Sequence, residues 1–286
     1  MKYVAVLMTV HNRREKTLCS LRALYGCALP DNCVVNVYLT DDGSTDGTAE
    51  AVAKAFPMVR ILHGDGNLYW NRGMINSWRE ASSARDYDFY LWLNDDTYLR
   101  STSLEVMLGA SALLDDRAIV VGTTLSSDRH RVTYGGWVDR KLIVPDGTLQ
   151  RCTSFNGNIV LVPGAVFDVV GMLDGRFHHN LGDIDYGLRA GDRGIASYVA
   201  PVICGYCDRG PQRPPRKTLR ARLADLYSPL ASAHPRHFFL FELRHHGLLP
   251  ALAHWIKLHL RALMPHLEGT IRRMAGKPRD KKTQHI

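Results

Sequence analysis

Three short acidic clusters in this chain could carry metal-ion and proton-transfer chemistry. They are DDGSTDGT at residues 41–48, LNDDT at residues 93–97 and GDIDYGLRA at residues 182–190. The first two directly follow apolar runs, VVNVYL and DFYLWL, which are typical of buried strands. Their carboxylates are therefore expected at the carboxyl ends of strands, where an open α/β sheet binds ligands. Carboxylates placed there can hold a hard divalent cation or accept a proton.

The elements that must position these clusters alternate between strands and helices over the first 100 residues. Strands are predicted at residues 4–9, 34–39, 58–62 and 88–93, and a helix follows each of the first three. Asp46 is the predicted N-cap of the second helix, and a glycine-containing loop, HGDGNLYWNRG, precedes the third. The alternation predicts parallel strands joined by right-handed crossovers, which is an α/β fold.

Beyond residue 100 the pattern changes. A helix at residues 104–114 and a strand at residues 119–122 precede RVTYGGWVDRKLIVPDG, whose glycines and strand-forming residues predict a hairpin. A strand at residues 155–163 and a short helix come next. The third acidic cluster then begins a helix that Gly191 or Gly194 is expected to end.

The positive charge of the chain is concentrated in its last quarter. Its 286 residues include 36 Lys and Arg against 28 Asp and Glu, but residues 211–286 alone hold 15 against 4. The first 210 residues are therefore slightly acidic, which argues against a nucleic-acid surface there. The PQRPPRK stretch predicts a linker. It divides the chain into a catalytic domain of residues 1–210 and a basic helical extension of residues 211–286, whose end is expected to be disordered.

The extension is predicted to form helices, the last of which is amphipathic. Its apolar face consists of Leu252, Trp255, Ile256, Leu260 and Leu263. Lys257 and Arg261 lie off that face. The pattern indicates a helix lying in the headgroup layer of an anionic membrane, and the alternative is a cap that packs on the catalytic domain.

Targeting signals and cysteines limit the location of the protein. The apolar run after Met1 is too short for a secretory signal, and no run approaches the roughly 20 apolar residues that span a bilayer. We therefore expect a cytoplasmic protein, peripheral on the inner face of the cytoplasmic membrane. Cys204 and Cys207 form a CxxC pair, but no second pair completes a four-thiolate zinc site, so the six cysteines are interpreted as incidental thiols.

Four motifs together resemble those of the family 2 glycosyltransferases, which are inverting enzymes of the GT-A fold. They are MTVHNR after the first strand, DDGSTDGT after the second, LNDDT after the fourth and the late GDIDYGLRA. The resemblance covers roughly residues 1–210. It implies a Rossmann-like three-layer sandwich followed by the C-terminal helical extension. The loop GDGNLYWNRGM is also similar to that of bacterial rhamnosyltransferase-like enzymes of surface polysaccharide synthesis.

The resemblance implies where the donor nucleotide binds. The residues that match positions contacting the base and ribose, or lie beside them, are Thr9, Val10, Asn12, Asp41 and Asp42. The loop residues expected to face the diphosphate or sugar are Asn67, Trp70 and Arg72. The alternative for this loop is that it only holds the next helix. Trp137 is expected either to stack on a sugar or to fill the core.

The metal site is implied by the DxD motif of the family. Asn94, Asp95 and Asp96 stand at that motif, with asparagine in place of the first acid. Asn94 and Asp95 then face the donor, with Asp95 toward the ribose, and Asp96 holds Mg²⁺ or Mn²⁺. Many relatives add a histidine after the catalytic base, which ICGYCDRG lacks. His245 or His246 is a possible substitute, and the alternative is a surface histidine.

Asp183 occupies the place of the catalytic base, which would take the proton of the attacking hydroxyl. Asp185, two residues on, points in a different direction on a helix. The alternative is that both aspartates only cap the helix and interact with its dipole.

The implied reaction moves a sugar from a nucleotide-diphosphate donor, dTDP- or UDP-linked, to a hydroxyl of a glycan or polyprenyl-linked acceptor. No nucleic acid is expected as a partner. One alternative is a nucleotidyltransferase, although MTVHNRR lacks the glycine-rich phosphate loop of that class. Another is a non-catalytic protein that binds a nucleotide or a nucleic acid.

Overall fold

The computed structural model describes residues 1–210 and 216–264. The chain divides into two compact units, Met1–Gly210 and Pro211–Ile286. The predicted linker and the predicted disordered end, residues 211–215 and 276–286, lie outside the described residues.

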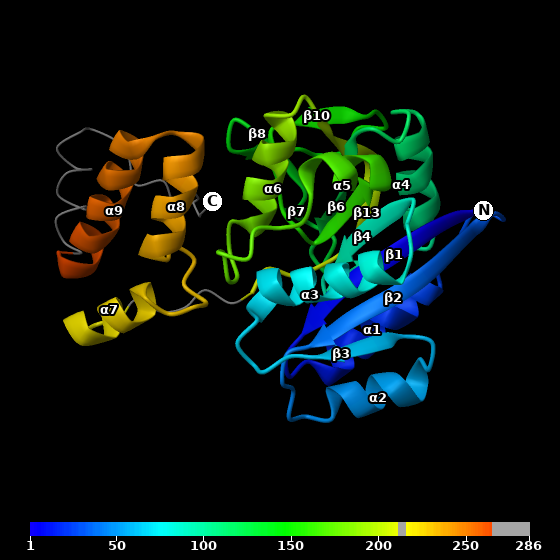
Figure 1. Cartoon of the computed structure of the whole chain (residues 1–286), viewed down its shortest axis with the longest axis horizontal. Coiled ribbons are helices and arrows are strands. Elements are labelled where there is room, and N and C mark those ends of the chain that lie inside the picture. Colours follow the sequence, from blue (N-terminus) through cyan, green and yellow to red (C-terminus); the bar gives the residue numbers. More distant parts are fainter. Residues whose placement is uncertain (211–215, 265–286) are drawn as a thin grey trace. The chain divides into compact units, whose positions relative to one another are not determined.

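The first unit is built on a ten-stranded sheet (Figure 1). Its parallel part has the strand order β4-β1-β2-β3. These strands are β1 (Lys2–Val10), β2 (Cys33–Asp41), β3 (Arg60–His63) and β4 (Phe89–Leu93). The chain thus runs outward from β1 to β3 and then returns to the other side of β1. This reversal makes a switch point between β1 and β4, and ligands of such sheets bind beyond the carboxyl ends of the strands there.

The remaining strands extend the sheet beyond β4. They are β12 (Ile159–Pro163), β6 (Ile119–Leu125), β13 (Ser197–Tyr206) and β10 (Gln150–Cys152), with β5 (Tyr98–Leu99) on β13 and β7 (Val132–Tyr134) on β6. Strand β12 is antiparallel to both β4 and β6, whereas β13 is parallel to β6. A small second sheet contains β11 (Ser154–Phe155), β8 (Gly136–Val138) and β9 (Lys141–Leu142). The predicted hairpin is confirmed by the antiparallel pair of β8 and β9.

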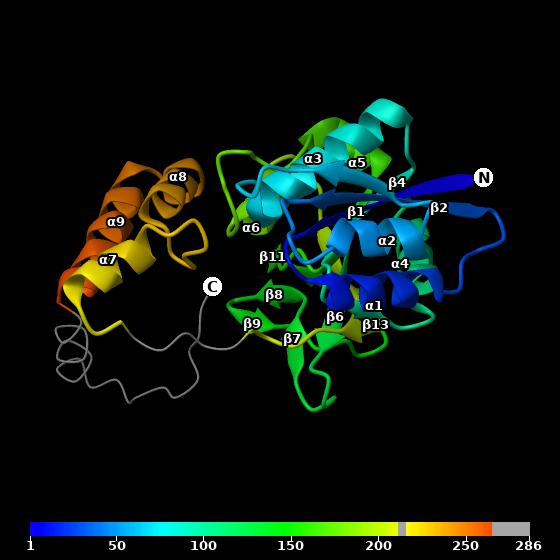
Figure 2. The same cartoon turned by 90° about the horizontal axis from the view of Figure 1, so that it is seen from below.

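Helices cover both faces of the large sheet (Figure 2). One face carries α1 (Arg14–Tyr25), α2 (Thr48–Ala55) and α4 (Ser103–Ala112), and the other carries α3 (Tyr69–Ala84), α5 (Gly164–Val170) and α6 (Gly182–Gly191). Successive side chains of β1 alternate between the two cores: Val6 and Met8 pack on the α1 side, Ala5 and Leu7 on the α3 side. Both faces are therefore buried, as expected for parallel strands. The predicted three-layer α/β architecture is confirmed.

Several predicted boundaries differ from the structure. The single strand predicted at residues 155–163 is wrong, because β11 and β12 are separate and belong to different sheets. Helix α2 begins at Thr48 with Gly47 as its N-cap, so the prediction of Asp46 as the cap is wrong by one residue. The Asp46 carboxylate still accepts the N–H of Thr48 at 3.1 Å. Helix α3 begins at Tyr69, so Trp70 and Arg72 lie in its first turn and not in the preceding loop.

The second unit contains three helices among its described residues, as predicted. They are α7 (Leu219–Leu226), α8 (Pro235–His245) and α9 (Leu248–Leu263). Polar contacts connect them, since Glu242 of α8 pairs with His254 of α9, and Arg222 of α7 donates to the carbonyl of Ala262. In the part of the chain that the structure describes, no helix is both long and apolar enough to span a bilayer.

Candidate functional site

The loops that follow β1 and β2 are tied together by side-chain contacts to backbone. Asn12 has a left-handed backbone, with φ of 52°, and its side-chain oxygen accepts the N–H of Thr45 at 2.7 Å. Its own N–H donates to the Ser44 hydroxyl at 2.9 Å. Asp41, at the end of β2, accepts the N–H of Ser44 at 2.9 Å and is 3% exposed. Asn12 and Asp41 therefore belong to one polar cluster at the carboxyl edge of the sheet.

Thr9 and Val10 are buried where β1 ends. The carbonyl of Val10 accepts the N–H of Asp42 at 2.8 Å. A Cβ atom at Gly73 would lie 2.1 Å from the Thr9 hydroxyl, so glycine permits the close approach of α3 to β1.

The carboxylate of Asp42 organises the loop that precedes α3. Its two oxygens accept N–H groups from Gly66 at 2.8 Å, Leu68 at 3.0 Å and Tyr69 at 2.8 Å. The last two lie at the start of α3, where backbone N–H groups have no partner within the helix. Asp42 therefore fixes the first turn of α3, which carries Trp70 and Arg72, and it acts here as a loop organiser.

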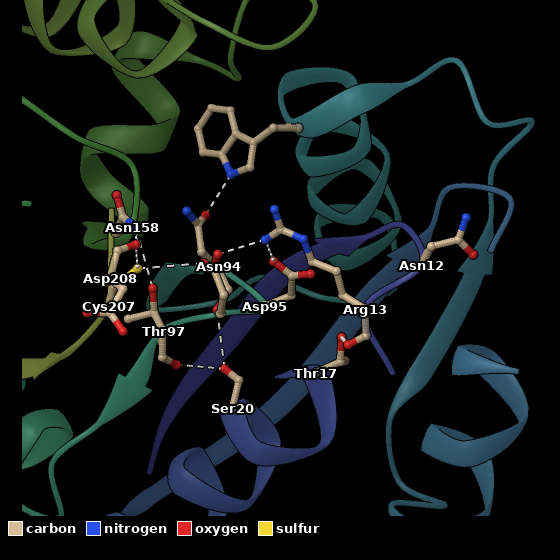
Figure 3. Close-up of polar contacts among 12 residues, drawn as sticks. Asn12, Arg13, Thr17, Ser20, Asn94, Asp95, Thr97, Asn158, Cys207 and Asp208 are labelled. Carbon is tan, nitrogen blue, oxygen red and sulfur yellow. Dashed lines mark hydrogen bonds and ion pairs between the residues drawn. The ribbon is translucent and has the colours of Figure 1, made fainter. Parts of the chain in front are cut away.

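Asp95 and Asp96 follow β4 and converge on one cationic nitrogen (Figure 3). The Nη1 atom of Arg13 lies 3.2 Å from Asp95 Oδ1 and 2.7 Å from Asp96 Oδ2. Arg13 follows β1, and β1 pairs with β4, so the contact lies at the switch point of the sheet. The site thus gathers two carboxylates and a guanidinium where the topology predicts a ligand.

Burial dominates the electrostatics of Asp95. It raises the pKa of Asp95 to about 7, against the opposing effect of the Arg13 charge, and the neighbouring Asp96 raises it further. A cation favours the ionised form of a carboxylate. A cation bound at Asp95 would therefore lower this raised pKa.

The turn that carries these carboxylates is held from several directions. The Ser20 hydroxyl of α1 donates to the carbonyl of Thr97 at 2.8 Å, and the N–H of Asn94 donates to the carbonyl of Asn158 at 3.1 Å. The thiol of Cys207, just beyond β13, donates to Asp96 Oδ1 at 3.7 Å. This turn, Asn94 to Asp96, is called the acidic turn below. It is positioned by contacts from α1 and from residues next to β12 and β13.

Asp183 is connected to the acidic turn through residues 157 and 158. The N–H of Gly157 donates to Asp183 Oδ2 at 2.8 Å, and Asn158, the next residue, binds Asn94. Trp70 also contacts this turn, because its indole N–H donates to the side-chain oxygen of Asn94 at 2.7 Å. A Cβ atom at Gly157 would lie 2.5 Å from the Trp70 ring and 3.3 Å from the Asp183 Cβ. Asp183, Trp70 and Asn94 are therefore neighbours around this turn.

Asp183 and Asp185 have different environments on α6. Burial raises the pKa of Asp183, opposed by N–H groups from Gly157 and Ile184. Asp185 is fully buried and accepts Arg189 Nε at 2.9 Å. Arg189 also donates to the carbonyls of Val170 and Met172. Asp185 thus belongs to a structural ion pair, whereas Asp183 lies at the site with a raised pKa, a property that suits a proton acceptor.

Other predicted site residues have separate contacts. Asn67 is exposed and binds Asp65, and Arg72 donates to the carbonyl of Gly175 at 2.9 Å. Trp137 in β8 donates to Asn156 at 3.0 Å, next to the turn at Gly157. His246 pairs with Glu242 at 2.8 Å in the second unit, where His245 also lies. Roles in donor or metal binding for these residues remain predictions.

Several residues of the site were not assigned from the sequence. Arg13, Gly157, Asn158 and Cys207 all contact the predicted acids or their turn. The position of Arg13, four residues after the end of the first predicted strand, was an available signal, since it places a cation at the same edge as the acids. Cys207 was interpreted as an incidental thiol, but its contact with Asp96 makes it part of the site.

The described residues contain no group of three or more His, Cys, Asp or Glu side chains arranged to hold a metal ion. Asp95 and Asp96 nevertheless offer hard oxygen ligands, and they already share one cationic group. Magnesium in particular is commonly bound by one or two carboxylates together with substrate phosphates and water. The donor set therefore fits a divalent cation whose remaining ligands come from a bound diphosphate.

A family model described as "Glycosyl transferase family 2" matches residues 5–169, which include β1 from Ala5 onward, the acidic turn after β4 and helices α1 to α4. The chain belongs to glycosyl transferase family 2. This membership favours glycosyl transfer over the nucleotidyltransferase alternative. The matched residues include the first three of the four motifs, and GDIDYGLRA at residues 182–190 lies beyond them.

Relatives of known name and structure extend this match. Two proteins of Mycobacterium tuberculosis, strains CDC 1551 / Oshkosh and H37Rv, are each 24% identical over 74% of this chain and 80% of their own length. Both are named N-acetylglucosaminyl-diphospho-decaprenol L-rhamnosyltransferase. The crystal structure of S. aureus TarS 1–349 is similar with a TM-score of 0.53 and 15% identity, over 91% of this chain and 72% of that one. The similarity supports the GT-A fold.

Asp42 offers a test of the loop organisation. We expect Asp42→Asn to lower the free energy of unfolding by about 1–3 kcal/mol, because one carboxylate oxygen becomes an N–H donor that faces backbone N–H groups. Urea unfolding followed by tryptophan fluorescence measures the change. The matched control is Asp65→Asn in the exposed loop before α3. It should lower the free energy of unfolding by less than half as much. Equal effects of the two substitutions would contradict the role of Asp42.

Gly157 offers a test of the turn between the two acidic sites. We expect Gly157→Ala to lower kcat about 100-fold, because the new methyl group must displace Trp70 and Asp183, and small displacements of reacting groups cost this much. The control is Gly109→Ala in α4, where a Cβ atom meets nothing within 4 Å. It should leave kcat unchanged. A Gly157→Ala enzyme with full activity and normal thermal stability would show that the turn does not position the site.

Proposed function

We propose that the chain transfers a sugar from a nucleoside-diphosphate donor to a hydroxyl of a lipid-linked glycan acceptor, with inversion at the anomeric carbon and with a divalent cation. The observation that carries this proposal is the arrangement around the turn at Gly157 and Asn158. Asp183 contacts the turn through Gly157, and the acidic turn of Asn94 to Asp96 contacts it through Asn158. One site can therefore hold both a leaving diphosphate and a base.

The acidic turn is suited to the diphosphate side of the donor. Asp95 and Asp96 would hold Mg²⁺ or Mn²⁺, which when bound neutralises the charge that grows on the leaving diphosphate. Asn94 is oriented by its bond to the Trp70 indole, and Trp70 is only partly buried. We infer that Asn94 and Trp70 shape the part of the site that receives the sugar.

Asp183 is suited to accept the proton of the acceptor hydroxyl. Two backbone N–H groups orient its carboxylate, and burial raises its pKa toward the working pH, which strengthens it as a base. An inverting transfer needs one base and no covalent sugar intermediate, so Asp185 has no required role in the reaction. Its buried pair with Arg189 agrees with that division.

The relatives support the choice of substrates. The mycobacterial proteins are named for a polyprenyl-diphosphate acceptor and for rhamnose, and TarS has been solved with UDP and with UDP-GlcNAc. We therefore propose a dTDP- or UDP-linked donor, with L-rhamnose as one sugar to be tested, and an acceptor of the polyprenyl-diphosphate glycan class used in surface polysaccharide synthesis.

The function is tested with Asp183→Asn. We expect kcat for sugar transfer to fall about 10²–10⁴-fold, because the neutral amide cannot accept the proton, while nucleotide binding persists. The kcat is measured by transfer from dTDP-rhamnose or UDP-GlcNAc to a polyprenyl-diphosphate acceptor. Nucleotide binding is measured by thermal stabilisation by dTDP or UDP with Mn²⁺. The control is Asp192→Asn, an exposed position just after the same helix.

Two further outcomes bear on the mechanism. Activity should be lost as the pH falls through the raised pKa of Asp183, since protonation removes the base, so the acid limb should lie above the ordinary carboxyl range of about 4. EDTA should abolish transfer and added Mn²⁺ should restore it.

Full activity of Asp183→Asn with intact nucleotide binding would refute the assignment of the base.

We also propose that the second unit binds an anionic membrane surface through α9. The five residues of its predicted apolar face are 39–50% exposed, and Leu249 at the start of the helix is 79% exposed. The described part of this unit, residues 216–264, has eight Lys and Arg against two Asp and Glu. Apolar side chains together with basic charge favour a helix in the headgroup layer, where a lipid-linked acceptor is also found.

Membrane binding is tested by sedimentation with vesicles. The protein should bind vesicles that contain phosphatidylglycerol and should not bind pure phosphatidylcholine vesicles. The double substitution Trp255→Glu and Ile256→Glu should reduce binding at least tenfold, because it places charge on the apolar face. Leu113→Glu, at an exposed apolar position of the first unit, should have no effect. Unchanged binding of the double variant would exclude the α9 face as the contact.

A further inference from the structure

Arg13 lies where the fold brings a cation and two acids to the same edge. Strand β1 ends at Val10 and strand β4 ends at Leu93, and the two strands pair in parallel. Arg13 and the pair Asp95 and Asp96 each follow within three residues of those ends. Their proximity is therefore a consequence of the topology and does not depend on a long or mobile loop.

The geometry of the contact is that of a single cation shared between two carboxylates. One nitrogen, Nη1 of Arg13, reaches an oxygen of Asp95 at 3.2 Å and an oxygen of Asp96 at 2.7 Å (Figure 3). A guanidinium that binds a single carboxylate commonly uses two parallel N–H groups. Here one end of the guanidinium instead stands between two acids, a position that suits a metal ion.

The two acids and the arginine differ in how firmly they are held. Asp95 and Asp96 have side chains that are 9% and 21% exposed, on a turn bound by Ser20, Asn158 and Cys207. The Arg13 side chain is 46% exposed. Its backbone carbonyl accepts the N–H and the hydroxyl of Thr17, and its guanidinium contacts Asp95 and Asp96. Asp95 and Asp96 are therefore the more firmly held groups of this contact. The Arg13 guanidinium is the group that a cation could displace.

We propose that Arg13 is an internal counter-ion of the acidic turn, which it neutralises in the absence of a divalent cation and from which the cation displaces it. This inference rests on the proposed metal site. Arg13 and the metal ion then compete for the same oxygens, so binding of one opposes binding of the other. After displacement, the guanidinium remains at the carboxyl edge of β1, where its donors suit a phosphate group.

The proposal is tested by Mn²⁺ binding without nucleotide. Wild type, Arg13→Gln and Arg14→Gln are titrated with Mn²⁺ at pH 8.5, with free Mn²⁺ measured by electron paramagnetic resonance. Arg14 is the matched control, because it is the adjacent arginine, half exposed, and pairs with Glu15 instead of the acidic turn. We expect Arg13→Gln to bind Mn²⁺ about three- to tenfold more tightly than the other two proteins, since solvent screens the 46%-exposed guanidinium and weakens its hold on the two acids.

Thermal unfolding gives a second readout that does not depend on catalysis. In EDTA, Arg13→Gln should melt below wild type, because the two carboxylates lose their counter-ion. With saturating Mn²⁺ the difference should shrink, since the metal replaces the lost charge, and linkage requires this if the variant binds Mn²⁺ more tightly. The melting curves also show directly whether the variant is folded.

Two results would overturn the proposal. Equal or weaker Mn²⁺ binding by Arg13→Gln would show that Arg13 does not compete with the cation. Absence of Mn²⁺ binding in all three proteins would show that the acidic turn does not hold the cation without a diphosphate, and would remove the competition with Arg13. Sugar transfer by the wild-type enzyme in EDTA would distinguish that case from a failure of the proposed transferase activity itself.

Discussion

The site depends on the parallel pairing of β1 with both of its neighbours. Because β2 and β4 flank β1 in the same direction, the segments after all three strands leave the sheet at one edge. Asn12 and Arg13 come from the central segment, Asp41 from one side, and Asp95 from the other. A chain with another strand order could contain the same motifs and fail to bring them together. The functional meaning of the acidic clusters therefore follows from the topology.

The second half of the sheet completes the site by a different route. Strand β12 runs antiparallel to β4, so the residues that precede β12, and not those that follow it, lie beside the end of β4. This arrangement places Gly157 and Asn158 next to Asn94, and it brings the start of α6 with Asp183 to the same turn. Asp183 and the acidic turn thus share one connection of two adjacent residues. The glycine is required there because Trp70 and Asp183 occupy the space of a side chain.

The sequence predicted the parts of the fold that have local signals. Apolar runs located β1, β2 and β4, and alternation with helices implied their parallel pairing, which is enough to place Asp41 and Asp95 at one edge. The start of α3 was predicted too late, because its first turn is determined by Asp42, a residue more than twenty positions earlier whose carboxylate binds the backbone of Leu68 and Tyr69.

Contacts between distant segments were beyond the reach of local patterns. Cys207 touches Asp96 across more than a hundred residues, and that contact depends on β13 being parallel to β6, which no periodicity in the sequence indicates. The position of Arg13 at the edge of the sheet could be predicted from the sequence, but its contacts with Asp95 and Asp96 could not. Residues that act through long-range geometry therefore have to be found in the structure, whereas residues at strand ends can be predicted from the sequence.

As the proposed cation site, the acidic turn would have to satisfy two opposing requirements. Two adjacent carboxylates attract a divalent cation, but in its absence they repel each other, and burial adds a cost that is visible in the raised pKa of Asp95. A fully buried arginine would remove that cost permanently and would also prevent the cation from binding, since breaking a buried ion pair is expensive. A half-exposed arginine lowers the cost and can still be displaced, because its side chain regains water when it leaves. Asp185 and Arg189 show the contrasting case in the same unit, where an ion pair with a fully buried acid serves the structure alone.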